Sequence, residues 1–294
     1  MISKTSSSIN ARSTQETNPW IWGTSWRILI VATGYMLASM VTGWLLGRNV
    51  EWGQLGLSLL SGILIGLTLC PIAARMQGSR LRHFVVWGSV LFLNTFSVMI
   101  EGAFYAPTHN PFLSMPIPWI ALTLFQSSVT AALISRLFAP NALSITFTPL
   151  GKRVWYSWIW RFLLSAFSYL VFYFIFGAIN YALVTKPYYE THVSGLVVPS
   201  PQIVLIAEMV RAPLIVLAIV PLILTLKMKK RWLAVLCGMI LFVIGGIIPL
   251  LLNTALPDFL RFASVIEIFF QNFLTGVVAV ALLGFALKSE SLGK

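Results

Sequence analysis

Long apolar stretches separated by short polar connections dominate the hydropathy pattern of this 294-residue chain. A helix that crosses a lipid bilayer needs about 20 mostly apolar residues. Eight segments meet that requirement: 26–46, 56–75, 84–105, 117–138, 157–184, 203–226, 232–255 and 262–287. These apolar runs are unbroken and do not alternate over about ten residues as transmembrane β-strands do. The pattern therefore predicts an all-α integral membrane protein with eight transmembrane helices.

The composition supports this interpretation. Hydrophobic residues make up 58% of the chain and charged residues only 10%, whereas an average globular domain carries roughly 25% charged residues. The chain therefore lacks the polar surface that a soluble domain of this size needs. The first 20 residues are polar and are not followed by a short apolar segment with a small-residue cleavage site, so we expect the first apolar segment to remain in the mature chain.

Lysine and arginine are concentrated on alternate connections. Cytoplasmic loops of membrane proteins carry the excess of these residues. Of the 20 in the chain, 16 fall on one side: Lys4, Arg12, Arg27, Arg75, Arg80, Arg82, Arg136, Lys152, Arg153, Arg161, Lys227, Lys229, Lys230, Arg231, Lys288 and Lys294. The opposite side has only Arg48, Lys186 and Arg261, and Arg211 lies within a span. This distribution predicts cytoplasmic N and C termini in a bacterial inner membrane.

The net charge of +12 is explained by the same distribution. Positive residues on the cytoplasmic side face anionic lipid headgroups, which we expect to be their partners. A nucleic-acid partner is not expected. Two tryptophan clusters on that side, Trp20, Trp22 and Trp26 and then Trp155, Trp158 and Trp160, fit an interfacial aromatic belt.

The two halves of the chain resemble each other. At an offset of 134 residues, Trp26, Arg27, Leu29, Tyr35 and Gly43 match Trp160, Arg161, Leu163, Tyr169 and Gly177. At an offset of 150, Leu64, Ile65, Leu67, Pro71, Gly88, Leu91 and Phe92 match Leu214, Ile215, Leu217, Pro221, Gly238, Leu241 and Phe242. At an offset of 145, Phe125, Gln126 and Thr130 match Phe270, Gln271 and Thr275.

Chance similarity between apolar segments is the alternative, but the shared Trp, Arg, Tyr and Pro in one order favour a duplication. Because each copy has an even number of spans, the copies share one orientation, as in the parallel repeats of some transporters. The expected organisation is a polar cytoplasmic tail (1–24), a first four-helix repeat (25–139), a basic cytoplasmic linker (140–156), a second four-helix repeat (157–287) and a cytoplasmic tail (288–294).

Four charged residues lie inside the spans: Glu101, Glu208, Arg211 and Glu267. A charge at the bilayer centre costs at least a few kcal/mol, so such groups face the interior of the bundle and find partners. Counted along the spans, all four lie in the extracytoplasmic half. None is repeated in the other copy, where the counterparts of Glu208 and Arg211 are Ser58 and Ser61 and those of Glu101 and Glu267 are Leu251 and Leu122.

Polar neighbours give these charges a direction. Ser264, Glu267, Gln271 and Thr275 are three or four residues apart and share one helix face. Asn94, Ser97 and Glu101 form a similar stripe, as do Thr123, Gln126 and Thr130. The candidate binding residues are Glu101, Glu208, Arg211, Glu267, Gln271, Asn94, Gln126, Asn180 and Asn253.

Two interpretations of these charges stay open at this point. In the structural one, Glu208 and Arg211 neutralise each other as an ion pair, and Glu101 and Glu267 are hydrated or cap loop amides. In the functional one, they line a site open to the extracytoplasmic side. Three carboxylates and one guanidinium leave an excess of negative charge, which a proton, a cation or a basic ligand would compensate.

No catalytic or cofactor signature accompanies the polar residues. The chain has no GxxxxGK[ST] phosphate loop, no HExxH and no GxSxG. Glu190 and His192 could join His109 and the intramembrane acids as metal ligands, but their spacing matches no signature, so neither a metal nor another cofactor is expected. Cys70 and Cys237 both fall in apolar segments and imply no disulfide framework.

These observations predict a multi-pass membrane protein that binds or transports a small or lipidic solute through an asymmetric polar pocket near the extracytoplasmic leaflet, with proton coupling as one option. A non-catalytic subunit or sensor that packs against a partner, or against further copies of itself, is the first alternative. Small residues such as Gly245 and Gly246, which permit close helix approach, favour it. The second is a membrane-embedded enzyme acting on lipid-linked or peptide substrates at the outer face.

Overall fold

The computed structural model describes residues 19–47, 51–105, 115–139, 154–191, 199–254 and 256–284. Within these ranges the chain is all-helical and has no strands. Eight helical stretches are long and apolar enough to cross a membrane, as the sequence predicts. Four are single helices of the first half: α1 (Pro19–Leu45), α2 (Trp52–Ala73), α3 (Arg80–Tyr105) and α5 (Pro116–Phe138).

The second half contains two interrupted stretches. The fifth consists of α6 (Trp155–Asn180), the π-helical segment η1 (Tyr181–Thr185) and the short α7 (Lys186–Glu190). The sixth is α8 (Pro201–Thr225). The seventh consists of α9 (Lys230–Phe242), the π-helical segment η3 (Val243–Ile247) and α10 (Ile248–Leu252), and the eighth is α11 (Asp258–Leu283).

Two boundaries differ from the sequence-based expectation. The first helix begins at Pro19, inside the segment expected to be a polar tail, because proline suits the first turn of a helix and an apolar Trp-Ile-Trp run follows it. The fifth span was expected to end at residue 184, yet residues 186–190 are helical. There Pro187 occupies the first turn, and Lys186 and Glu190 form an exposed i,i+4 ion pair.

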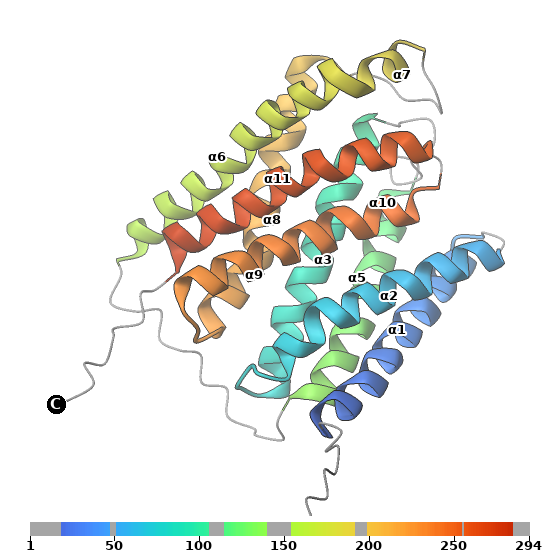
Figure 1. Ribbon diagram of the computed structural model, residues 1–294, viewed down its shortest axis with the longest axis vertical. Helices are drawn as coiled ribbons and strands as arrows, with labels where there is room; N and C mark the ends of the chain where they lie inside the picture. The colour runs from blue at the N-terminus through green and yellow to red at the C-terminus, as the bar shows by residue number, and fades with distance from the viewer. Residues whose placement is uncertain are drawn as a thin grey trace, which may run out of the picture.

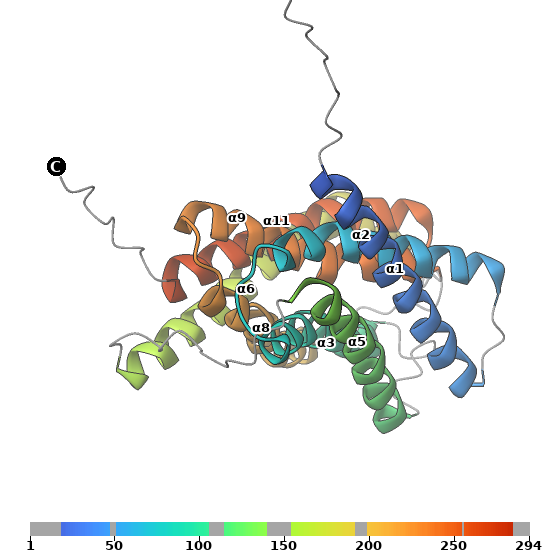
Figure 2. The same ribbon diagram turned by 90° about the horizontal axis from the view of Figure 1, so that it is seen from below.

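The helices form two layers with one helix at each flank (Figures 1 and 2). One layer consists of α11, the α9–η3–α10 stretch and α2, and the other of α8, α3 and α5. At one flank α6 packs against α11 and α8, and at the other α1 packs against α2 and α5. The eight stretches therefore form a closed ring, and α3 contacts η3 across its middle.

Small residues let the helices approach closely. A methyl group on Gly276 of α11 would lie 2.5 Å from the backbone nitrogen of Gly238 on α9. One on Gly62 of α2 would lie 2.6 Å from the carbonyl oxygen of Ala32 on α1. Because lipid tails are as apolar as leucine, packing of this kind, rather than hydrophobic burial, drives helix association in membranes.

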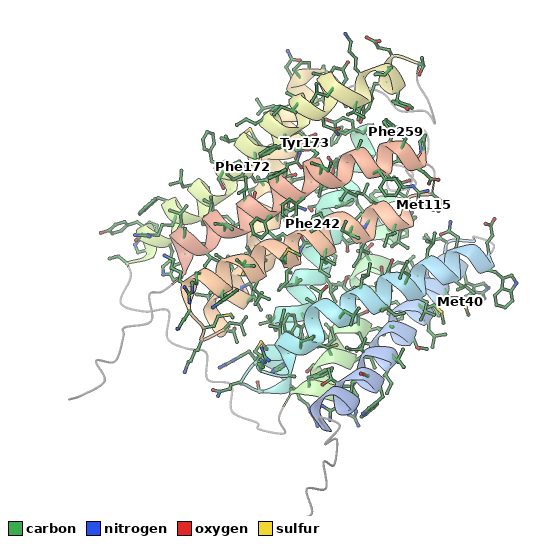
Figure 3. The ribbon with its side chains drawn as sticks, viewed as in Figure 1. Met40, Met115, Phe172, Tyr173, Phe242 and Phe259 are labelled. Carbon is green, nitrogen blue, oxygen red and sulfur yellow. The ribbon has the colours of Figure 1, made fainter. Side chains whose placement is uncertain are left out.

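Large apolar side chains cover the outside of the bundle (Figure 3). Met40 on α1 and Phe259 on α11 are among those exposed. The polar residues discussed below are mostly buried between helices, within an interior that is otherwise largely apolar. An apolar outer surface is what the hydrocarbon core of a bilayer requires.

Candidate functional site

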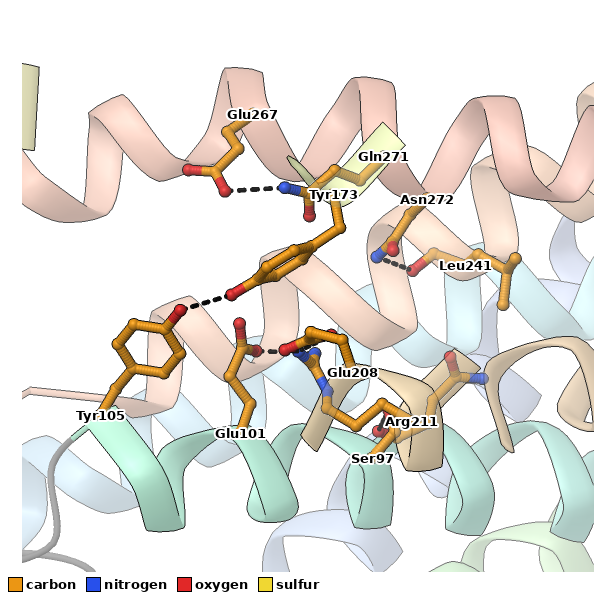
Figure 4. A network of polar contacts seen from close by, with 11 residues as sticks. Ser97, Glu101, Tyr105, Tyr173, Glu208, Arg211, Leu241, Glu267, Gln271 and Asn272 are labelled. Atoms are coloured by element: carbon orange, nitrogen blue, oxygen red, sulfur yellow. Dashed lines mark hydrogen bonds and ion pairs between the residues drawn. The ribbon is translucent and has the colours of Figure 1, made fainter. Parts of the chain in front are cut away.

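A guanidinium shared by two carboxylates is the centre of the site (Figure 4). The Nη1 atom of Arg211 donates to both oxygens of Glu208, at 2.6 and 2.8 Å. Its Nη2 atom lies 2.6 Å from Oε2 of Glu101. The side chain of Glu208 is fully buried, whereas 32% of the Glu101 side chain is exposed. Glu208 is thus an internal counterion, and Glu101 is the member of the trio that solvent reaches.

Helix geometry explains this arrangement. Glu208 and Arg211 are three residues apart on α8 and therefore lie on the same face. That face packs against α3, whose last turns carry Glu101. The ion pair foreseen in the structural interpretation does form, but it also recruits a second carboxylate from another helix.

Glu267 is held in a different way. Its Oε2 atom accepts a hydrogen bond of 2.5 Å from Nδ2 of Asn180, and its Oε1 atom accepts one of 2.7 Å from Nε2 of Gln271. Gly177 on α6 makes room for this carboxylate, since a methyl group there would lie 3.3 Å from Oε1. The two amides orient Glu267 but supply no positive charge.

A cavity of about 420 Å³ joins these groups. Glu101, Arg211, Asn180, Glu267 and Gln271 all line it, and Asn253 and Ser264 complete its polar wall. Its lining comes from the last turns of α3, from α6 to α7, from the first turns of α8 and α11, and from η3 and α10. We call it the charged cavity. It lies at the end of the bundle opposite the first turn of α1 and the last turn of α11 (Figure 1).

Both π-helical segments in the described part of the chain border the charged cavity. Tyr181 and Thr185 of η1, and Gly245 and Gly246 of η3, are among its lining residues. A π-helical turn inserts one residue into a helix and is found frequently at functional sites. Both segments thus contribute directly to the cavity wall.

Tyrosines form a further part of the wall and were missed by the sequence analysis. Tyr105 and Tyr173 join their hydroxyl groups at 2.7 Å, across α3 and α6 (Figure 4). The ring of Tyr189 lies 6.3 Å from that of Tyr105 and 6.0 Å from that of Tyr181. Tyr169 faces Arg211, with 5.9 Å between its ring centroid and the guanidinium carbon. The four-residue spacing of Tyr169 and Tyr173, which places both on one helix face, was the available signal.

The remaining candidate residues lie elsewhere. Asn94 is buried one level below the charged cavity, where its amide donates to the carbonyl of Val90 at 2.7 Å and its Oδ1 atom lies close to Gly245. Gln126 lines a separate cavity of about 20 Å³, together with Tyr35 and Thr130. The structure therefore brings seven of the nine candidates together at the charged cavity. Asn94 and Gln126 lie outside this group.

The metal site considered from the sequence falls partly outside the described residues, which do not include His109 and His192. Glu190 is exposed beside Lys186. Within the described ranges, no group of three or more His, Cys, Asp or Glu side chains has the arrangement of a metal site. No known protein family, curated protein or solved structure matches the chain.

Proposed function

We propose that this chain is a membrane protein that binds a small or lipidic solute in the charged cavity and transports it from or to the extracytoplasmic side. The observation that carries the proposal is the placement of Glu101, Arg211 and Glu267 on the wall of one cavity rather than in a closed contact. Its volume of about 420 Å³ falls in the range of roughly 300–1,000 Å³ that is typical of small-molecule sites.

The energetic cost of the Arg211 trio favours the same conclusion. Burying a carboxylate and a guanidinium costs several kcal/mol per ion before their attraction is counted, and well-packed apolar residues stabilise a bundle at least as well. Intramembrane ions are for this reason the usual components of substrate and proton pathways. Glu267, which the amides of Asn180 and Gln271 hold in the cavity wall, adds an acid that a coupled proton would titrate.

We also propose that the bundle is a duplicated four-helix unit, and the contacts within the helix ring support this. If α1, α2, α3 and α5 correspond to α6, α8, the α9–α10 stretch and α11, a half-turn about an axis along the bundle maps each neighbour pair onto another. The contacts of α1 with α2 and α5 become those of α6 with α8 and α11. The contact of α3 with α8 becomes that of α10 with α2.

The matched arginines of the two halves contact the ends of corresponding helices, by different interactions. Arg27 lies over the ring of Phe138 at the end of α5, and its counterpart Arg161 donates to the carbonyl of Leu282 at the end of α11. Where the serines at 39 and 58 share a hydrogen bond of 3.2 Å in the first copy, Tyr173 and Glu208 stand in the second.

The two cavities are related in the same way. Tyr35 and Gln126 of the small cavity correspond to Tyr169 and Gln271 of the charged cavity. The described residues that line the small cavity include no charged one. In this proposal one of two equivalent interhelical spaces has acquired charges and volume, and the other has remained a neutral packing defect.

The orientation belongs to the proposal as well. With both termini cytoplasmic in a bacterial inner membrane, the charged cavity faces outward and the basic connections face anionic lipid. Arg161 and Lys230 have a further role at the cytoplasmic end, because they donate to the carbonyls of Leu282 and Ala281 in the last turn of α11.

Cysteine accessibility tests the proposal. Cys70 and Cys237 are buried, so the native chain provides a low background. In intact cells, a membrane-impermeant maleimide is expected to label Ser264→Cys in the cavity wall but not Ile266→Cys, which is 65% exposed on the outer surface of the same helix. The reagent attacks a thiolate, which forms in water and not in lipid.

A cysteine at Gln77, which is exposed at the opposite end of the bundle, fixes the orientation, because it is expected to react only after permeabilisation. Equal labelling of Ser264→Cys and Ile266→Cys, or no labelling of either in permeabilised cells, would refute an open cavity. Labelling of Ser264→Cys only after permeabilisation would reverse the orientation.

A further inference from the structure

The charged cavity has an unbalanced set of ionisable groups. Among the described residues that line it, Arg211 is the only basic side chain, and both terminal nitrogens of its guanidinium are already engaged by Glu208 and Glu101. In the described part of the chain, the hydrogen bonds of the Glu267 carboxylate come from the neutral amides of Asn180 and Gln271. With the three carboxylates ionised, the formal charge of the group is −2, so the site attracts positive charge and repels anions.

The aromatic wall narrows the chemistry of that positive charge. Tyr105, Tyr169, Tyr173, Tyr181 and Tyr189 line the cavity beside the two reachable carboxylates, Glu101 and Glu267. Aromatic faces attract cations through the ring quadrupole and form the cages that recognise ammonium groups. Hard metal ions such as Ca²⁺ and Mg²⁺ prefer several oxygen ligands at short range. Here Glu101, one of the two reachable carboxylates, is already bound to Arg211, 2.6 Å away, so the cavity suits an organic cation better than a metal ion.

The cavity also offers space for an apolar body. Val98, Leu256, Leu260 and Ile268 line it together with Phe174. A ligand with a cationic head and a hydrophobic body would place its charge among Glu267 and the tyrosines and its body against these side chains. A ligand bearing a carboxylate or phosphate would have to displace Glu101 from Arg211.

We infer that the charged cavity binds an organic monocation, an amine or quaternary ammonium compound with an apolar body, whose charge is balanced by Glu267. This inference rests on the proposed solute-binding function and names its ligand class. The charge of the cavity alone would suit any cation, and the tyrosine wall restricts the ligand to a cation that can contact aromatic faces.

Four phenyl compounds of similar size test the inference in calorimetric titrations of the purified protein in uncharged lipid nanodiscs. They are 2-phenylethylammonium and benzyltrimethylammonium as cations, 2-phenylethanol as the neutral analogue and phenylacetate as the anion. Both cations are expected to bind the wild-type protein at least about tenfold more tightly than the alcohol, which corresponds to 1.4 kcal/mol, and phenylacetate is expected not to bind.

Glu267→Gln keeps the shape of the side chain and removes its charge, and it is expected to weaken cation binding by about tenfold. Glu190→Gln is the matched control, because Glu190 is an exposed acid near the same end of the bundle and is outside the cavity lining. It is expected to leave cation binding unchanged. Should Glu267→Gln fail to fold, Tyr189→Leu removes an aromatic face instead and is expected to lower the affinity for both cations.

Several results would overturn the inference. These are equal affinity for the alcohol and the cations, preference for phenylacetate, or equal effects of Glu267→Gln and Glu190→Gln. Absence of cation binding in a protein whose Ser264→Cys variant labels from outside would show an open cavity of another specificity, so the proposed function would stand while the ligand class fell. Absence of labelling removes both.

Discussion

Replacing Arg211 by methionine should be the most damaging single change among the charged residues. The substitution preserves much of the side-chain volume but leaves Glu208 fully buried without a cation, and it frees Glu101. Removing one partner of a buried ion pair costs about 3–5 kcal/mol. At roughly 2 °C per kcal/mol for a chain of this size, the midpoint of thermal unfolding should fall by about 6–10 °C.

The magnitudes should follow burial. Glu101→Gln should cost only about 1 kcal/mol, because Arg211 keeps both bonds to Glu208 and Glu101 is partly exposed. Arg261→Met is the control, since Arg261 pairs with the exposed Asp258 and such pairs contribute about 0–1 kcal/mol. All variants are compared by thermal unfolding in one non-ionic detergent.

A double-mutant cycle then separates the ion pair from simple packing. Because the damage in Arg211→Met comes from the uncompensated carboxylate, adding Glu208→Gln should restore part of the stability. The reasoning is refuted if the double variant is less stable than Arg211→Met alone, or if Arg211→Met is no more harmful than Arg261→Met.

Two further predictions concern packing and the tyrosine pair. Gly276→Ala should destabilise the protein by about 1–3 kcal/mol, because its methyl group would overlap the backbone of Gly238. The control Gly56→Ala has open space around it and should be neutral or stabilising. Equal losses of stability in thermal unfolding would contradict the close crossing of the two helices. Tyr105→Phe and Tyr173→Phe should each lower the free energy of unfolding by about 1 kcal/mol in the same unfolding assay. Because the two substitutions remove the same hydrogen bond, the double variant should lose no more stability than either single variant. Full additivity of the two would show that the hydroxyl groups do not interact.

Much of the helical framework could be predicted because lipid imposes it. Eight apolar runs translate into eight crossing helices, since backbone groups in a bilayer must be satisfied within the helix. Spacing also indicated partners on one helix: Glu208 with Arg211 and Glu267 with Gln271 are each three or four residues apart. Contacts of this kind need no knowledge of the tertiary structure.

Contacts between helices could not be read from spacing. That Glu101 meets Arg211, and that Asn180 meets Glu267, depends on which helices become neighbours in the ring. Gln126 shows the limit clearly. It shares the Phe and Thr neighbours of Gln271, but Leu122 stands where Glu267 does, and its helix borders the small cavity, whose described lining is uncharged.

The π-helical segments were not predicted from the sequence either. Tyr181–Thr185 and Val243–Ile247 contain no proline, and the signals beside them, Pro187 and Pro249 just after each segment and the Gly245–Gly246 pair in the second, do not specify a π-helical turn. Both segments line the charged cavity. The tyrosine wall was missed for a different reason, because tyrosines in a membrane sequence are ordinarily assigned to the interface.

Hydroxyl-radical footprinting of the wild-type protein tests most directly whether the charged residues surround a water-filled cavity. Radicals formed from water oxidise nearby tyrosines, and two of them give a matched comparison without any substitution. Tyr189 lines the charged cavity, whereas its internal control, Tyr35, lines the small one. We predict that Tyr189 is oxidised several times faster than Tyr35. Equal rates for the two tyrosines would mean that the charged residues form a closed contact, and the proposed site would not exist.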